Sequence, residues 1–508
     1  MLSMQGVNVT SSRSWILFAV CSLGWLILSL TIAPSMNGTD VFIFRDAGWN
    51  LAARGSFESA GLIYMQDLVP RFYSHYTPAM PLLFAGFASI FPRNAYAGTI
   101  FNELLGILAA SVALYWTLRQ PRTRLRTFAV LAIAVLPVAF VTYDRPEALA
   151  LVFFTCTIAF AARPNPRPVL VGLFLALTFL AHPFVAATAA VWASSLALAN
   201  NWNLARRWLT SFWQIAVMGV TAIVVLIPVA LLYHFLDPDS LARFAKHALG
   251  YNSGLGVALS SGSHASFLQK VHRAVLAGGS FSVEMYFLSL VPAVAIAVWA
   301  VAKRKQLGAA EYLAIAAALS CEAIAFILFP TQMNYLYFLA FALPVGLLVV
   351  GCARKQLATP ALALLLFIVC AHLPLIGVSV AERVEERSSF QAAQMQPLFL
   401  RDNLPSPDAI VAVEGGSYDL YKPQFRHLIE LDNARDIHDL SKVAAIANCY
   451  GGLLDGPRNV APLPPVLVAS QFHMIQPDPQ HLWISLKGHR ILKGQWGYGC
   501  DLYLRNNK

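Results

Sequence analysis

Residues 39–91 read TDVFIFRDAGWNLAARGSFESAGLIYMQDLVPRFYSHYTPAMPLLFAGFASIF, and this segment is the most informative part of the sequence. It lies between two apolar blocks and is far too long to be a simple connector. Its first part, VFIFRDAGWNLAARG, has the pattern of an amphipathic helix that ends at Gly55. A second apolar piece follows at 79–92. We therefore expect a structured loop over residues 34–96 rather than a linker.

The composition around this loop indicates a membrane protein. Hydrophobic residues make up 57% of the 508 positions and charged residues 12%, about half the charged share of a soluble domain. The apolar residues come in blocks of about 20, which is enough to cross a bilayer core as a helix. The net charge of +10 is concentrated in short connectors between blocks, so it indicates membrane topology rather than a nucleic-acid surface.

The apolar blocks predict about eleven transmembrane helices, near 15–33, 97–117, 127–142, 147–162, 168–181, 185–199, 211–235, 281–302, 311–329, 335–352 and 359–379. The blocks before and after His182-Pro183 are short, which leaves tilt or re-entry of one of them open. Alternate connectors hold clustered Arg and Lys, and such connectors are cytoplasmic by the positive-inside rule. We expect a multi-pass protein of a bacterial inner or plasma membrane, with its N-terminus in the cytoplasm.

The remaining residues, 385–508, mix polar and apolar segments and predict a small extracytoplasmic α/β domain. Two strand-like segments occur in it, AIVAV at 409–413 and PVLVA at 465–469. The expected fold is thus an all-α polytopic membrane module over 1–384 followed by this domain. Cys449 and Cys500 both lie in the domain and are a candidate disulfide.

Ionisable residues of the apolar blocks gather toward the outer side in this topology. Because charge inside a bilayer is costly, such residues are candidate functional groups, and their asymmetry indicates a cavity open to the outside. The alternative is that they lie where water and headgroups already reach. The residues are Glu103, Glu147, His182, His234, Glu284 and Glu322.

Three segments resemble the C-type glycosyltransferase superfamily: DVFIFRDAG from Asp40, YSHYTPAMPLL from Tyr73, and DRPEALA at 144–150. The sequence is most similar to the polyprenol-phosphate-mannose-dependent mannosyltransferases of family 87, with the protein O-mannosyltransferases and aminoarabinose transferases as further relatives. Protein-modifying members commonly have two adjacent acids where this chain has Asp40-Val41. The resemblance implies a membrane enzyme that takes a sugar from a polyprenyl-phosphate donor.

The resemblance implies Asp40 as the general base for the acceptor hydroxyl; a helix N-cap is the alternative role. Arg45, Arg71 and Arg145 are outer-side cations whose guanidinium groups suit phosphate oxygens. Arg145 could instead neutralise Glu147. Asp46 is a candidate for sugar hydroxyls, or a member of an ion pair on a solvated face.

The other candidate substrate-binding residues are aromatic, basic or acidic residues of the outer side: Tyr73, His75, Tyr76, Glu147, His182, Lys270 and Arg273. The tyrosines and His75 could stack on a sugar or line the lipid groove, or could anchor the chain at the interface. His182 could donate to phosphate or cap the turn before Pro183. Lys270 and Arg273 could cover a bound donor or contact lipid headgroups.

The function expected from these features is transfer of a sugar to a hydroxyl of a lipid, glycan or protein in the cell envelope. We expect no cofactor beyond the lipid-linked co-substrate and no nucleic-acid partner. No Cys or His spacing resembles a zinc site, although the clustered outer carboxylates leave a divalent metal open. A lipid-linked sugar flippase or transporter is the alternative function, and a non-catalytic component of a glycan-assembly complex is a further one.

Overall fold

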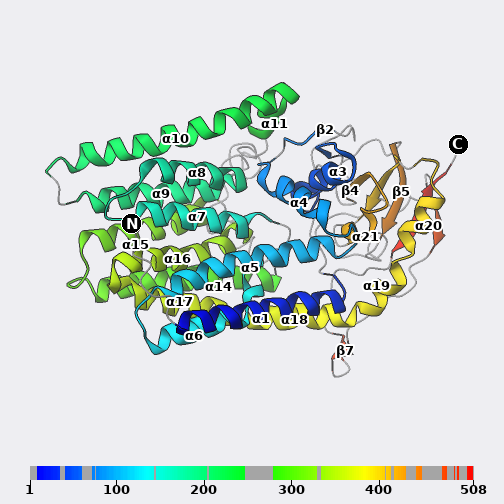
Figure 1. Ribbon diagram of the computed structural model, residues 1–508. Helices are drawn as coiled ribbons and strands as arrows, with labels where there is room; N and C mark the ends of the chain where they lie inside the picture. Colours follow the sequence, from blue (N-terminus) through cyan, green and yellow to red (C-terminus); the bar gives the residue numbers. More distant parts are fainter. Residues whose placement is uncertain are drawn as a thin grey trace.

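The computed structural model describes residues 9–34, 41–59, 71–74, 76–141, 145–202, 205–245, 279–328, 333–406, 408–413, 417–430, 442–448, 472–476, 485–486, 489–490 and 500–506. Long helices lie side by side in a bundle (Figure 1). They are α1 (Val9–Thr31), α5 (Ala97–Leu118), α6 (Arg124–Val135), α7 (Glu147–Ala161), α8 (Pro168–Ala181), α9 (Pro183–Asn200), α10 (Arg207–Leu236), α14 (Gly279–Ala302), α15 (Ala309–Leu328), α16 (Met333–Ala353), α17 (Ala358–Ala371) and α18 (Leu373–Glu385). The predicted apolar blocks are mostly helical. The block at 127–142 is an exception in its second half, because α6 ends at Val135 and a short 3₁₀ helix, Pro137–Phe140, follows.

Several of these helices have the dimensions of membrane spans. Within the described residues, five helical stretches are long and apolar enough to cross a bilayer: Ser12–Thr31, Ala97–Leu118, Pro183–Asn200, Arg207–Leu236 and Lys355–Ala381. Shorter apolar helices include α7 and α8. The chain therefore has the character of a membrane protein, while the number of spans and their orientation stay predictions.

The first loop is built from short elements: α2 (Val41–Phe44), α3 (Asp46–Arg54), strands β1 (Glu58–Ser59) and β2 (Arg71–Phe72), and α4 (Ala79–Ile90). The single amphipathic helix predicted from Val41 to Gly55 is interrupted at Arg45, which separates α2 from α3. Helix α3 ends where Gly55 takes a left-handed conformation with φ of 73° and donates its N–H to Leu51, which is the ending predicted for this segment. Helices α3 and α4 pack so closely that a Cβ on Gly48 would collide with the carbonyl of Pro81.

The C-terminal part contains a five-stranded mixed sheet with the order β4-β3-β5-β9-β6. Its strands are β3 (Ile410–Val413), β4 (His427–Glu430), β5 (Val443–Asn448), β6 (Phe472–Gln476) and β9 (Asp501–Arg505). Strand β3 runs parallel to β4 and β5, whereas β9 is antiparallel to β5 and β6. The predicted strand at 409–413 is thereby confirmed, and the one at 465–469 lies outside the described residues.

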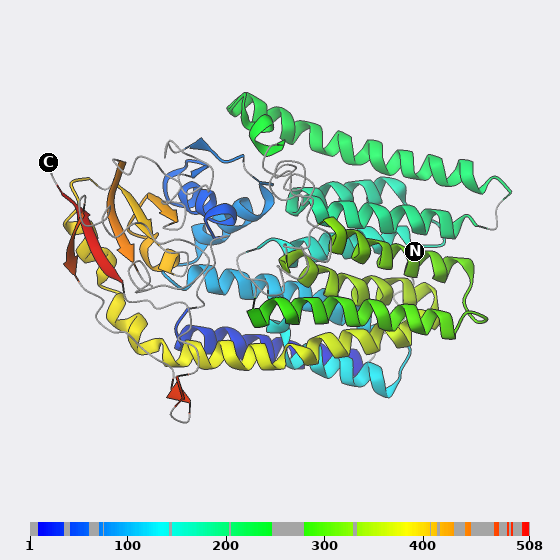
Figure 2. The ribbon, with the colours of Figure 1, turned by 180° about the vertical axis from the view of Figure 1, so that it is seen from behind.

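Smaller helices connect the bundle to the sheet. Helix α18 leads into α19 (Arg387–Ala393) and α20 (Gln396–Asp402), and the short α21 (Tyr418–Tyr421) follows β3. The first-loop helices and the sheet lie together at one end of the bundle, as both views show (Figures 1 and 2). Cys500, next to β9, is disulfide-bonded; its predicted partner Cys449 lies outside the described residues.

Candidate functional site

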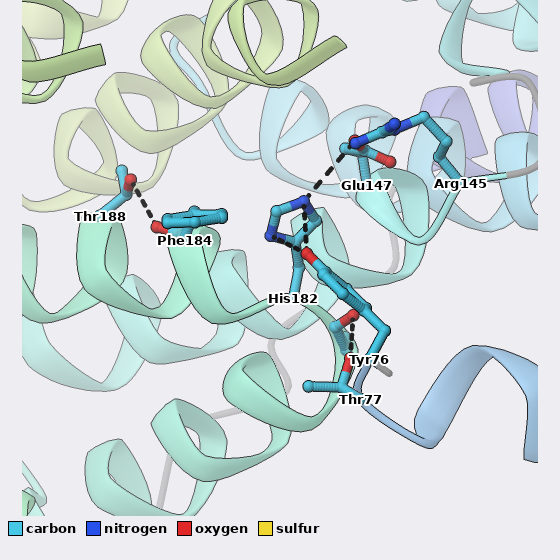
Figure 3. A network of polar contacts seen from close by, with 8 residues as sticks. Tyr76, Thr77, Arg145, Glu147, His182, Phe184 and Thr188 are labelled. Carbon is cyan, nitrogen blue, oxygen red and sulfur yellow. Dashed lines mark hydrogen bonds and ion pairs between the residues drawn. The ribbon is translucent and has the colours of Figure 1, made fainter. Parts of the chain in front are cut away.

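Four of the residues singled out in the sequence come together at the end of the bundle that faces the first loop. Tyr76 comes from the segment before α4, Arg145 precedes α7, Glu147 begins α7, and His182 separates α8 from α9. Figure 3 shows His182 between Tyr76 on one side and Glu147 on the other, with Arg145 beyond Glu147. We call these four residues the polar cluster.

Local sequence explains why His182 points into this cluster. Pro183 lacks an N–H and disfavours helical backbone in the preceding residue. His182 accordingly adopts an extended conformation with φ of −158° and ψ of 113°, so that α8 ends and α9 begins around it. The prediction that the helix breaks at this point is confirmed.

The contacts within the polar cluster form a chain. The hydroxyl of Tyr76 lies 3.3 Å from both ring nitrogens of His182, and Nε2 of His182 lies 3.7 Å from Oε1 of Glu147. Nε of Arg145 donates a hydrogen bond of 2.7 Å to the same carboxylate oxygen. Oε1 of Glu147 thus lies next to both the imidazole of His182 and the guanidinium of Arg145.

Phe44 of the first loop forms an aromatic support for this chain. The guanidinium carbon of Arg145 lies 5.5 Å from the centroid of the Phe44 ring, which is the geometry of a cation–π contact. The same ring packs edge-on against Tyr76 with centroids 5.1 Å apart. Thr77 adds a hydrogen bond of 3.0 Å to the carbonyl of Ala181, so the first loop is attached directly to the break between α8 and α9.

Burial differs across the polar cluster. The side chains of Glu147 and His182 are 1% and 2% exposed, whereas that of Arg145 is 14% exposed. Burial lowers the pKa of His182, although Glu147 opposes this shift. The imidazole is therefore neutral near pH 7 and has one nitrogen that donates and one that accepts. Arg145 is the most exposed of these three side chains.

Two other predicted residues lie elsewhere. Arg45 and Asp46 are completely buried. The guanidinium of Arg45 contacts α21, and the carboxylate of Asp46 contacts α21 and Lys422, so neither side chain joins the polar cluster. The alternative that placed Asp46 on a solvated face is wrong, because the side chain is enclosed by polar partners from the C-terminal part of the chain.

Tyr73 is also fully buried. Its ring packs edge-on against Phe57 with centroids 5.3 Å apart, and burial raises the pKa of its hydroxyl well above the ordinary value. Asp40, His75, Lys270 and Arg273 lie outside the described residues, as does the side chain of Arg71. Their roles stay predictions.

Two acids of the helices have local partners. Glu103 accepts a hydrogen bond from Ser29 and lies 3.3 Å from Nη1 of Arg383. Glu322 accepts a hydrogen bond of 2.5 Å from Ser289. These contacts connect α5 to α1 and α18 through Glu103, and α15 to α14 through Glu322. Among the described residues no three or more His, Cys, Asp and Glu side chains are arranged to hold a metal ion, and metal dependence stays untested.

Sequence reasoning missed Phe44, Tyr418, Asp419 and Lys422. Phe44 was part of an apolar run with no polar signal of its own. The other three residues lie in SYDLYKP at 417–423. Nothing in this short polar segment indicates that it is buried against a loop hundreds of residues earlier.

The comparisons with known proteins concern the fold. No protein-family model and no curated protein matches the sequence. Among solved structures, ArnT from Cupriavidus metallidurans bound to undecaprenyl phosphate is 13% identical, with 98% of each chain covered and a TM-score of 0.52. The Archaeoglobus fulgidus oligosaccharyltransferase in complex with Zn and sulfate is 12% identical, with 85% of this chain and 68% of that chain covered and a TM-score of 0.43.

The similarity to ArnT extends over nearly the whole of both chains and therefore concerns the bundle together with the C-terminal part. The chain thus shares its fold with ArnT. At this level of identity the similarity concerns architecture, whereas function depends on the residues of the site.

Proposed function

We propose that this protein is a glycosyltransferase that moves a sugar from a polyprenyl-phosphate donor to a hydroxyl acceptor on the non-cytoplasmic face of a membrane. The observation that carries this proposal is the polar cluster, a buried Glu147 and His182 with a partly exposed Arg145, where the first loop meets α7, α8 and α9. It occurs in a chain with the fold of ArnT, which was solved with undecaprenyl phosphate bound.

In the proposed reaction the acceptor oxygen bonds to the anomeric carbon of the sugar while the bond from that carbon to the phosphate oxygen breaks. The proton of the acceptor hydroxyl passes to the general base, for which Asp40 is our candidate. Polyprenyl phosphate leaves with the additional negative charge. Arg145 is our candidate for stabilising that charge, because a guanidinium group binds phosphate oxygens in a planar fork.

The other members of the polar cluster hold Arg145 and supply hydrogen bonds. Glu147 fixes the guanidinium through the 2.7 Å bond, and Phe44 supports it from the side. Neutral His182 and the hydroxyl of Tyr76 offer donors that do not bring a second full charge into the site. We further propose mannose as the sugar, on the sequence resemblance described above, and a lipid, glycan or protein hydroxyl as the acceptor.

The test uses purified protein reconstituted in lipid nanodiscs with polyprenyl-phosphate mannose and, in parallel, other polyprenyl-phosphate sugars. Release of polyprenyl phosphate together with a glycosylated acceptor is the expected result. An Asp40→Asn variant that inserts normally should lose about 10²- to 10⁴-fold in rate, as expected for removal of a general base. Undiminished transfer by this variant would remove Asp40 from the mechanism.

A further inference from the structure

The junction between α2 and α3 is held by residues from the far end of the sequence. The hydroxyl of Tyr418 donates to Oδ1 of Asp46 at 2.6 Å, and Nζ of Lys422 lies 2.5 Å from the same oxygen. Nη1 of Arg45 donates to Oδ2 of Asp419 at 3.1 Å. Two adjacent loop residues of opposite charge are therefore each paired with a group of opposite charge at α21.

These pairs are buried, which makes their geometry demanding. Arg45 and Asp46 have no exposed surface, and Asp419 and Lys422 are 3% and 2% exposed. Burial lowers the pKa of Lys422, and the nearby Asp46 opposes this shift. Because a buried charge is strongly destabilising without its partner, the loop cannot move away from α21 without exposing or abandoning these charges.

A third element encloses the ion pair of Arg45 and Asp419. Gly98 lies in the first turn of α5, and a Cβ at this position would collide with Nη1 of Arg45 and with Oδ2 of Asp419. Both contacts are to charged ends of buried side chains, so neither can withdraw cheaply. Position 98 therefore requires glycine for as long as the pair is in place.

The junction leads directly to the polar cluster. Phe44 immediately precedes Arg45, and its ring supports both Arg145 and Tyr76. On the same short helix, Phe42 packs edge-on against Tyr418 with centroids 4.9 Å apart. The position of α2 is thus fixed from the C-terminal side, while its last residue contacts two members of the polar cluster.

We propose that Tyr418, Asp419 and Lys422 are positioning residues. They fix the α2–α3 junction, and through Phe44 this junction holds Arg145 and Tyr76 in the positions that bind the donor phosphate. The effect on donor binding rests on the proposed function, whereas the fixing of the junction does not. None of the three positioning residues contacts the polar cluster in the interactions described above.

The first experiment measures the junction itself. Amide hydrogen exchange over residues 41–54 is followed by mass spectrometry in wild type, Lys422→Met and the double variant Asp46→Asn/Lys422→Met. We expect exchange in Lys422→Met to be faster by about tenfold or more, because Asp46 loses its opposite charge. The double variant should recover most of the protection. Unchanged exchange in Lys422→Met would overturn the proposal.

The second experiment separates positioning from general stability. Gly98→Ala pushes on the ion pair from α5, and Gly86→Ala is its matched control, since a Cβ on Gly86 of α4 meets nothing within 4 Å. The KM for the polyprenyl-phosphate sugar is measured on the folded fraction isolated by size exclusion. We expect Lys422→Met and Gly98→Ala to raise this KM by about tenfold. The double variant Asp46→Asn/Lys422→Met and the control Gly86→Ala should leave it unchanged. A smaller folded fraction with an unchanged KM would mean that these residues only stabilise the fold.

Failure of the two proposals can be told apart. If wild type transfers no sugar from any donor, the proposed function fails. The Kd for undecaprenyl phosphate alone then takes the place of KM, and it should rise in Lys422→Met and Gly98→Ala but not in Gly86→Ala. Equal affinity in all three variants, with normal exchange over 41–54, would overturn the positioning role regardless of enzymatic activity.

Discussion

Replacement of Arg145 by Gln is the perturbation that most directly addresses the polar cluster. The wild-type guanidinium is held by Glu147 at 2.7 Å and by the Phe44 ring at 5.5 Å, and 14% of the side chain is exposed. A hydrogen bond to a charged partner contributes about 1.5–3 kcal/mol. Loss of one such bond to phosphate corresponds to a Kd raised by about ten- to a hundredfold.

The assay is the Kd of undecaprenyl phosphate in nanodiscs, with Arg163→Gln as the matched control. Arg163 follows the other end of α7, and its guanidinium also lies over a phenylalanine, Phe160, at 4.6 Å. We expect this variant to bind like wild type. A change of less than about threefold in Arg145→Gln, well below one charged hydrogen bond, would refute the assignment of Arg145 to the phosphate.

A second variant tests whether the loss reflects Arg145 itself. Removing the guanidinium alone leaves the buried carboxylate of Glu147 near the ligand, where it would repel a phosphate. The double variant Arg145→Gln/Glu147→Gln removes that repulsion. We expect its affinity to stay at least several-fold below that of wild type, since the cation is absent. Full recovery would mean that Arg145 serves only to neutralise Glu147.

Three further predictions concern the fold and the site. Tyr76→Phe removes the hydroxyl that lies 3.3 Å from His182, so we expect the free energy of unfolding to fall by about 1–3 kcal/mol; an unchanged thermal midpoint in detergent would contradict this. Gly48→Ala should lower that midpoint because its Cβ meets Pro81, whereas Gly24→Ala, with nothing within 4 Å, should not. Burial lowers the pKa of His427 from 6.5. Below about pH 6.5 the unfolded chain therefore takes up a proton at His427 that the folded chain does not. The free energy of unfolding should decrease as the pH is lowered, until the pH drops below the pKa of His427 in the folded protein. His427→Gln should flatten this part of the profile of midpoint against pH, and an unaltered profile would remove His427 as its cause.

Much of the fold was predictable because its determinants are local. Apolar blocks long enough for a bilayer became helices, the left-handed Gly55 ended α3, and Pro183 forced the break at His182. The segment AIVAV became strand β3. In each case neighbouring residues alone impose the conformation, through backbone sterics or through the length and polarity of one segment.

The site was predictable only in part, because its assembly depends on long-range pairing. Arg145, Glu147 and the His182 break were visible as polar groups at helix ends. The partners of Arg45 and Asp46 were not, since they lie 374 and 372 positions away. Sequence patterns show which side chains are charged, but not whether they are buried against a distant segment. Asp46 was a candidate ligand-binding residue by its sequence, and packing of the loop against α21 makes it one end of a buried ion pair.

The most direct test of the proposed activity follows one labelled donor in proteoliposomes. A polyprenyl-phosphate sugar is placed in the membrane together with an acceptor, and both cleavage of its sugar–phosphate bond and its movement between leaflets are measured. We predict glycosylated acceptor and free polyprenyl phosphate with wild type, and both products about 10²- to 10⁴-fold more slowly with Asp40→Asn. Movement of intact donor between leaflets without cleavage, for every sugar tried, would contradict a glycosyltransferase and indicate a flippase.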